Sequence, residues 1–150
     1  MSVECVREYL KEYGLEERVK EFAVSSATVE LAAQAVGVEA ARIAKTLSFH
    51  LGEGCVLVVA AGDARIDNHK FKETFHTKAK MLTADEALAM TGHAVGGVCP
   101  FALPEGVRVC LDRSLQRFDA IYPAAGSASS AVKLTCEELQ TSTGGEWVDV

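Results

Sequence analysis

Two apolar segments separated by three residues limit the possible folds of this chain more than any other part of it. Residues 45–51 and 55–61 both have the pattern of β-strands, and Gly52-Glu53-Gly54 lies between them. A short glycine-containing connection joins two strands as an antiparallel hairpin, whereas a parallel pair needs a crossover of about a dozen residues or more. We therefore expect this hairpin to form the centre of a sheet.

Short helices and further strands are predicted around the hairpin. Capping signals and helical spacing predict helices from Val3 to just before Gly14, over 28–36 and 67–75, from Thr83 to Met90, and from Thr135 onward. Additional strands are expected over 107–111, 120–123 and 147–150. Several strands are joined too tightly for helical crossovers, so the sheet of this mixed α/β chain is expected to be mixed or curled.

The length and composition indicate one domain covering residues 1–150. Hydrophobic residues make up 49% of the chain, and no repeat or linker divides it. No apolar run approaches the ~20 residues of a membrane helix, and the N-terminus lacks the apolar region of a signal peptide. Five cysteines without a CxxC motif favour a reducing compartment. We expect a soluble, cytoplasmic protein without a membrane contact.

The charge distribution limits how the chain can meet nucleic acid. A net charge of −6 argues against nonspecific wrapping of RNA or DNA, which needs many Lys and Arg contacts to phosphates. A local basic island is nevertheless present at Lys70, Lys72, Lys78 and Lys80. This island is either a solvated helix face with its following turn or a contact for an RNA.

Several catalytic motifs are absent from the sequence. It contains no GxSxG elbow, Walker loop, Rossmann glycine fingerprint or HExxH motif. The four histidines lack the close spacing of metal ligands, and no cysteine pair supplies further ligands. We therefore expect neither a metal nor a cofactor.

Two loops and one lysine are candidate ligand sites. The loop from Gly92 to Pro100 contains a glycine pair, Gly96-Gly97, whose bare backbone N–H groups suit a carbonyl oxygen or a phosphate, although it also suits a plain turn. Lys45 begins an apolar strand and either ends the sheet in solvent or faces a pocket. The small-residue loop over 122–130 exposes further N–H and hydroxyl groups, or is simply a surface loop.

The order of these segments resembles the YbaK/ProX family, which is similar to the editing domain associated with prolyl-tRNA synthetases. The resemblance runs from about Ala27 to Leu139, and its specificity lies in the order of its motifs. The motifs are Thr28-Val29-Glu30-Leu31-Ala32-Ala33, Ile43-Ala44-Lys45-Thr46-Leu47, Asp67 before Lys70-Phe71, Gly92 with Val95-Gly96-Gly97-Val98-Cys99-Pro100-Phe101, Ile121-Tyr122, and Ala125-Gly126-Ser127.

The resemblance implies a trans-acting aminoacyl-tRNA deacylase with a barrel-like mixed sheet flanked by short helices. Such an enzyme hydrolyses the ester of a mischarged small amino acid (Ala, Ser, Cys or an analogue) on a tRNA, here expected to be tRNA(Pro). The implied partners are the 3′ acceptor end of the mischarged tRNA and a prolyl-tRNA synthetase. An aminoacyl ester is already activated, so a positioned water and a stabilised oxyanion suffice without a nucleophile–base pair.

The resemblance also implies roles for particular residues. Lys45 would position the substrate, and the backbone of Gly96 and Gly97 would polarise the ester carbonyl or fix the α-amino group. The substrate-binding residues would be Thr46, His93, Val98, Cys99, Pro100, Gly126, Ser127 and Ser129. From the basic island, the expected tRNA contacts are Lys70, Lys78 and Lys80.

The chain departs from better-known members in its last loop. Those members have a glycine pair and basic residues where this chain has Ala124-Ala125-Gly126-Ser127-Ala128-Ser129, which leaves the edited amino acid open. Two alternatives to the deacylase remain. One is a binding module that keeps the aminoacyl-tRNA pocket without turnover. The other is a hydrolase that uses Cys99 with His93, which needs a lowered thiol pKa.

Overall fold

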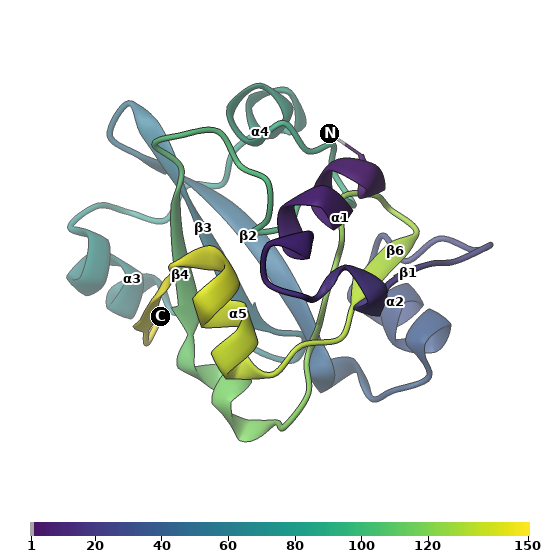
Figure 1. The fold of residues 1–150 in the computed structure, drawn as a ribbon. Coiled ribbons are helices and arrows are strands. Elements are labelled where there is room, and N and C mark those ends of the chain that lie inside the picture. Colours follow the sequence, from purple (N-terminus) through teal and green to yellow (C-terminus); the bar gives the residue numbers. More distant parts are fainter. Residues whose placement is uncertain (1) are drawn as a thin grey trace.

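A mixed five-stranded sheet forms the centre of the protein (Figure 1), whose computed structural model describes residues 2–150. The strands are β1 (Val19–Glu21), β2 (Ile43–Leu51), β3 (Gly54–Ala61), β4 (Arg108–Asp112), β5 (Tyr122–Pro123), β6 (Ser130–Val132) and β7 (Glu146–Val148). The α-helices are α1 (Val3–Lys11), α2 (Val29–Val36), α3 (Asn68–Phe75), α4 (Ala84–Thr91) and α5 (Cys136–Thr143). Three short 3₁₀ turns are η1 (Glu16–Arg18), η2 (Ala40–Arg42) and η3 (Arg113–Arg117).

The predicted hairpin lies at the centre of the sheet, whose strand order is β5-β2-β3-β4-β7. Strands β2 and β3 pair antiparallel from Ala44–Ala61 to Leu51–Gly54, and Gly52 takes a positive φ of 61° in the turn. The other pairs, β2–β5, β3–β4 and β4–β7, are parallel. The prediction of a mixed, curled sheet flanked by short helices is therefore confirmed.

The helix boundaries follow the capping signals of the sequence. Thr28 caps α2, and Thr83 and Thr135 form complete capping boxes with Glu86 and Glu138. A second, two-stranded ribbon of β1 and β6 was not predicted. Its strands have three residues each, which is too short for a periodic pattern to be recognised.

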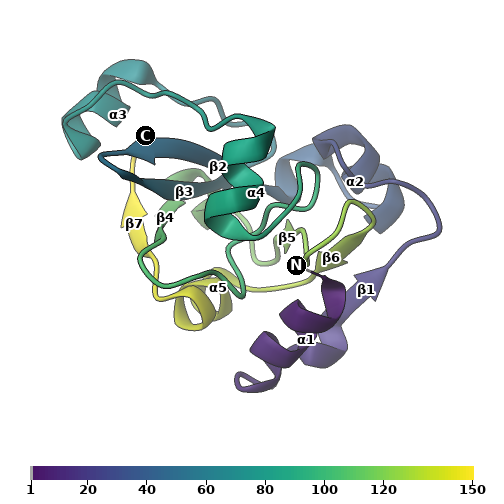
Figure 2. The same ribbon diagram turned by 90° about the horizontal axis from the view of Figure 1, so that it is seen from above.

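Helices cover both faces of the sheet (Figure 2). On one face, Val6 and Leu10 of α1 and Leu139 of α5 pack in the largest core cluster. On the other face, Phe71 and Phe75 of α3 pack against β2 and β3. Helix α2 packs beside the start of β2, against Ile43. No helix within residues 2–150 is long and apolar enough to cross a membrane.

Candidate functional site

The outer edge of β2 is left open over a short stretch. Strand β5 pairs with β2 only at Ile43 and Ala44. Further along, the Leu82 N–H donates to the Ser48 carbonyl at 3.0 Å, and the His50 N–H donates to the Lys80 carbonyl at 2.8 Å. The edge between Ala44 and Ser48 therefore has no neighbouring strand among the described residues.

Thr46 lies in the middle of this gap. Backbone groups two residues apart on a strand point the same way, so Thr46, like Ser48 and His50, turns its N–H and C=O away from β3 and into the gap. The Thr46 hydroxyl oxygen is buried and has no hydrogen-bond partner within residues 2–150. A buried polar group without a partner is costly, and a ligand that bonds to it would remove that cost.

The gap opens into a cavity of about 310 Å³. Its walls come from the start of α2 (Ser26–Val29 and Ala32), from β2 (residues 43–48), from Met81 and Leu82, from Val95, Gly96 and Val98 of the glycine loop, and from Tyr122, Ala124, Ser130 and Ala131. Small side chains dominate this lining. Of the residues implicated from the sequence, Lys45, Thr46, Gly96 and Val98 lie on its surface.

Lys45 projects from the opposite face of β2 to Thr46, because neighbouring side chains alternate along a strand. Its ammonium group donates to the carbonyl oxygens of Ala64 and, at 3.4 Å, of Gly62, just beyond the end of β3. Burial lowers the pKa of Lys45, and the nearby carboxylates of Asp63 and Glu30 oppose that shift. Both acceptors are neutral, so the positive charge remains available to an anionic group at the cavity.

Gly62 allows the close packing that holds these carbonyls in place. A Cβ atom at Gly62 would lie 2.1 Å from the Ala40 carbonyl oxygen and 2.8 Å from Val29 Cγ1. The backbone after β3 can therefore rest directly on η2 and α2. Neither Gly62 nor Ala64 was implicated from the sequence, since their contact with Lys45 depends on how the hairpin end folds back.

The two glycines of the 92–100 loop have different functions. The Gly97 N–H donates to the Ala94 carbonyl at 3.0 Å, and Gly96 has a φ of +91°, as in the third position of a type II turn. The Gly97 N–H is thus already bonded within the turn and is not free for a substrate carbonyl. A Cβ at Gly97 would lie 2.9 Å from the Ser127 backbone, so this glycine lets the two loops touch.

Gly96 faces the cavity instead. Its N–H makes no backbone hydrogen bond to any residue in the described part of the chain, and Gly96 lines the wall opposite Thr46 in the lining set. A backbone N–H free in a water-poor cavity suits a carbonyl oxygen that gains negative charge.

The serine loop is organised by its own hydroxyl groups. Ser130 Oγ accepts from the N–H groups of Ala125 and Ser127, each at 3.2 Å, and Ser127 Oγ accepts from the Ser129 N–H at 3.2 Å. Gly126, with a φ of +96°, packs against α1, where a Cβ would lie 2.7 Å from the Ser2 carbonyl oxygen. Gly126, Ser127 and Ser129 therefore support the cavity wall from behind, and Ser130 forms part of the wall.

His93 and Cys99 lie beneath the glycine loop, completely buried. His93 Nε2 is 2.8 Å from the Phe101 carbonyl oxygen and 3.5 Å from Cys99 Sγ. Burial raises the pKa of Cys99 to about 12 and lowers the pKa of His93. This environment opposes the thiolate that a cysteine nucleophile requires. Pro100 is also buried, so these three residues shape the loop without reaching the cavity surface.

Alkylation is expected to spare the activity and Cys99. Treatment of the native protein with iodoacetamide should modify the exposed Cys5 and leave the buried Cys99 unmodified, because a buried neutral thiol is unreactive. Peptide mass spectrometry measures both sites, and Cys5 serves as the internal control for reagent activity. Loss of hydrolysis in proportion to labelling of Cys99 would instead support the cysteine hydrolase.

The basic island divides into parts. Lys70 pairs with Asp149 at 3.2 Å on the far side of α3, whereas Lys80 precedes Met81 at the rim of the cavity. Lys78 lies in the same segment, after α3. Within residues 2–150, no group of three or more His, Cys, Asp or Glu side chains is placed to hold a metal ion.

The fold and cavity place this protein among editing domains. The sequence profile described as "Aminoacyl-tRNA editing domain" matches residues 24–142. The chain therefore belongs to the aminoacyl-tRNA editing domain family, and the resemblance found in the sequence is confirmed. The family confirms the prediction of an enzyme of the aminoacyl-tRNA deacylase class.

Relatives and solved structures agree with this assignment. The uncharacterised protein YwhH of Bacillus subtilis is 51% identical, covering 100% of this chain and 97% of that protein. EbsC of Enterococcus faecalis, named as a candidate Cys-tRNA(Pro)/Cys-tRNA(Cys) deacylase, is 29% identical over 82% of this chain and 76% of its own. A solved structure of a candidate trans-editing enzyme for prolyl-tRNA synthetase has a TM-score of 0.89 at 30% identity, covering 98% of this chain and 94% of that one.

Part of a synthetase is also similar. The proline–tRNA ligase of Streptococcus sanguinis is 26% identical over 82% of this chain, which corresponds to 20% of the ligase. This chain is thus similar to one segment of a much longer enzyme.

Proposed function

We propose that this protein hydrolyses, in trans, the ester between a small amino acid and the 3′ end of a tRNA. The amino acid is Ala, Ser, Cys or a small analogue, and the tRNA is tRNA(Pro). The observation that carries the proposal is the gap at the β2 edge, where the free main-chain groups of Thr46 face a small cavity beside Lys45. The names of EbsC and of the trans-editing structure support the choice of substrate.

The dimensions of the cavity favour a small aminoacyl group. A volume of about 310 Å³ lies at the low end of ligand sites, which commonly range from roughly 300 to 1,000 Å³. The amide-like edge of Thr46 can bond to the α-amino group or carbonyl of an amino acid as a neighbouring strand would. The terminal nucleotide then extends beyond the cavity, where the Lys45 ammonium meets its phosphate.

The reaction needs positioning and one stabilised charge. A water oxygen adds to the ester carbonyl carbon, and negative charge develops on the carbonyl oxygen. The free N–H groups of Gly96 and Thr46 are the donors we assign to that oxygen. When the carbon–oxygen ester bond breaks, the ribose oxygen takes up a proton, releasing the amino acid and the tRNA. Lys78 and Lys80 are the contacts we assign to the tRNA at the cavity rim, and a prolyl-tRNA synthetase is the proposed partner.

Hydrolysis of a panel of mischarged tRNAs tests the function. The substrates are tRNA(Pro) charged with Ala, Ser, Cys or 2-aminobutyrate, with correctly charged Pro-tRNA(Pro) as the specificity control. We expect rapid loss of one small amino acid, while the prolyl ester survives because the larger ring does not fit the cavity. Binding without acceleration of any ester would indicate a module that has lost turnover, and would overturn the proposal.

Thr46→Val is expected to separate stability from activity. The valine has the same shape, and it removes a buried hydroxyl that lacks a protein partner, so the free energy of unfolding should stay the same or rise. The catalytic efficiency kcat/KM should fall roughly tenfold, as for one lost hydrogen bond to the substrate. Urea denaturation and deacylation kinetics measure the two effects.

Thr91→Val is the matched control for that substitution. Its hydroxyl is also buried, but it donates to the Ala87 carbonyl at 2.6 Å and accepts from the His93 N–H at 3.1 Å. This variant should lose about 1–3 kcal/mol of stability. Equal destabilisation of both variants would mean that the Thr46 hydroxyl has a protein partner and no ligand role.

A further inference from the structure

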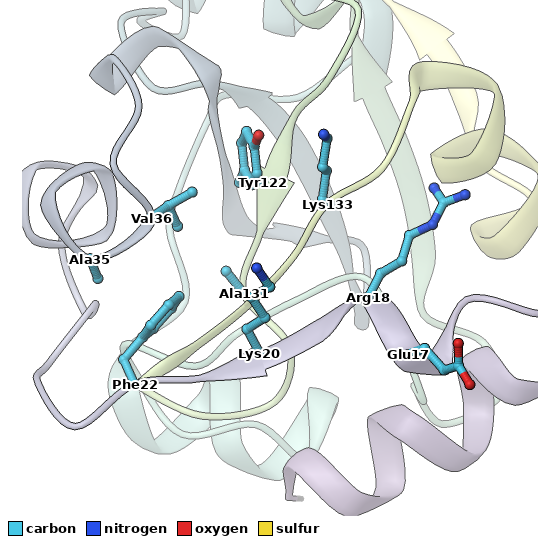
Figure 3. A pocket seen from close by; sticks show the side chains of 9 residues that line it. All are labelled: Glu17, Arg18, Lys20, Phe22, Ala35, Val36, Tyr122, Ala131 and Lys133. Carbon is cyan, nitrogen blue, oxygen red and sulfur yellow. The ribbon is translucent and has the colours of Figure 1, made fainter.

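A second cavity, of about 450 Å³, lies on the outer side of the β1–β6 ribbon. Figure 3 shows the side chains that line it: Lys20 and Phe22 from β1 and the residue after it, Ala131 and Lys133 from β6 and the residue after it, and Tyr122 from β5. The side chains of Lys20 and Lys133 extend to the same side of the ribbon as the Tyr122 ring (Figure 3). None of the roles assigned above uses this cavity.

Strand alternation explains why these side chains gather there. Val19 pairs with Val132, and both side chains are buried in the main core. Their neighbours must therefore point outward, and Lys20, which pairs with Ala131, begins the outer face. Phe22 and Lys133 follow at a spacing of two from Lys20 and Ala131, so they share that face.

The cavity is positively charged in a chain whose net charge is −6. Neither Lys20 nor Lys133 takes part in any ion pair formed within residues 2–150. Arg18 also lines the cavity, where its guanidinium is 2.5 Å from Glu138 Oε1, and Glu17 is the acidic residue of the lining. Two uncompensated ammonium groups beside two aromatic rings fit a strand of RNA, because cations meet phosphates and bases stack on rings.

The second cavity adjoins the first. Tyr122 and Ala131 line both cavities, so they form the wall between them. An RNA whose esterified end occupies the first cavity can therefore continue into the second without crossing the body of the protein.

We propose that this cavity binds the unpaired nucleotides that precede the terminal adenosine of the tRNA, an inference that rests on the proposed function. Lys20 and Lys133 contact the phosphates of these nucleotides. A base stacks on Phe22, while Tyr122 marks the boundary with the aminoacyl site.

Binding of a short RNA tests this proposal without any hydrolysis. The probe is a fluorescently labelled, single-stranded hexanucleotide ending in CCA, and anisotropy gives its Kd over a range of salt concentrations. The Lys20→Gln/Lys133→Gln double variant should bind about tenfold more weakly, and the slope of log K against log salt should shrink by about 1.4, since two phosphate contacts are lost at ~0.7 each. Phe22→Leu should weaken binding severalfold with an unchanged slope, because stacking carries no charge.

Lys11→Gln/Arg113→Gln is the matched control, since it removes two positive charges from residues outside both cavities. It should bind RNA like the unaltered protein. Equal weakening by the control, or equal displacement of the RNA by polyglutamate and by unlabelled RNA, would overturn the proposal and leave a general attraction between charges. Thermal unfolding confirms that each variant is folded.

A kinetic comparison distinguishes the failure of this proposal from failure of the proposed function. The double variant should raise KM for aminoacyl-tRNA about tenfold while leaving hydrolysis of a 3′-aminoacyl adenosine, which lacks the preceding phosphates, unchanged. Equal loss on both substrates would overturn the RNA groove. Normal RNA binding with no hydrolysis of either substrate would keep the groove and reject the deacylase.

Discussion

Lys45→Ala is expected to lower kcat/KM for the deacylated tRNA by about 100-fold or more. The ammonium group lies beside the open edge of β2, and its two protein acceptors are neutral carbonyls. A single preorganised charged donor in a water-poor site commonly contributes a factor of roughly 10² to 10³. Loss of Lys45 removes both the anchor of the terminal phosphate and a positive charge near the reacting ester. Single-turnover deacylation, with enzyme in excess, measures the effect on chemistry directly.

The same substitution should also destabilise the protein slightly. The sequence favoured a lysine with little part in the fold, but the structure shows that its ammonium ties β2 to the backbone at Gly62 and Ala64. Because the side chain is partly exposed, a loss of about 1 kcal/mol is expected, below the roughly 1.5–3 kcal/mol of a buried charged hydrogen bond. Lys45→Met keeps the aliphatic stem and separates packing from charge.

Lys72→Met is the control for a lysine of α3 that is exposed to solvent. It should leave both the deacylation rate and the thermal midpoint unchanged. Retention of more than about a tenth of the activity by a folded Lys45→Met protein would remove Lys45 from the site, because a charged anchor is worth more than that factor.

Local signals made much of the fold predictable. Thr28, Thr83 and Thr135 begin helices by bonding to backbone groups three residues away, so the relevant atoms are close in sequence. The hairpin at Gly52 is likewise a local event. Strands β1 and β6, in contrast, are stabilised by each other across more than a hundred residues, and three-residue strands carry too little pattern to be detected.

The site could be predicted in part for the same reason. Lys45 and Gly96 were identified from strand and loop motifs, and both line the cavity. The gap around Thr46 could not be foreseen, because it exists only where β5 ends and the Lys80–Leu82 segment begins. The burial of Cys99 and His93 was also hidden, since side chains in an irregular loop follow no fixed alternation.

Gly96→Ala is expected to lower kcat/KM at least about tenfold. Gly96 has a φ of +91°, and a Cβ there would lie 3.1 Å from Ala27 Cβ and 3.3 Å from Ala128 Cβ. The loop must then move away from α2 and the serine loop, and with it the N–H that we assign to the ester oxygen. Displacement of a single oxyanion donor typically costs a factor of about 10² in kcat, and partial relaxation of the loop reduces that figure.

Gly106→Ala provides a control with the same backbone strain. Its φ is +89°, and nothing lies within 4 Å of the added Cβ. Both variants should lose about 1 kcal/mol of stability from the left-handed backbone. Only Gly96→Ala should lose activity, and its loss should appear in kcat more than in KM, because the donor acts on charge that develops in the transition state. Equal activity of the two variants would show that strain alone is felt at Gly96 and would transfer the oxyanion role to the Thr46 edge of β2.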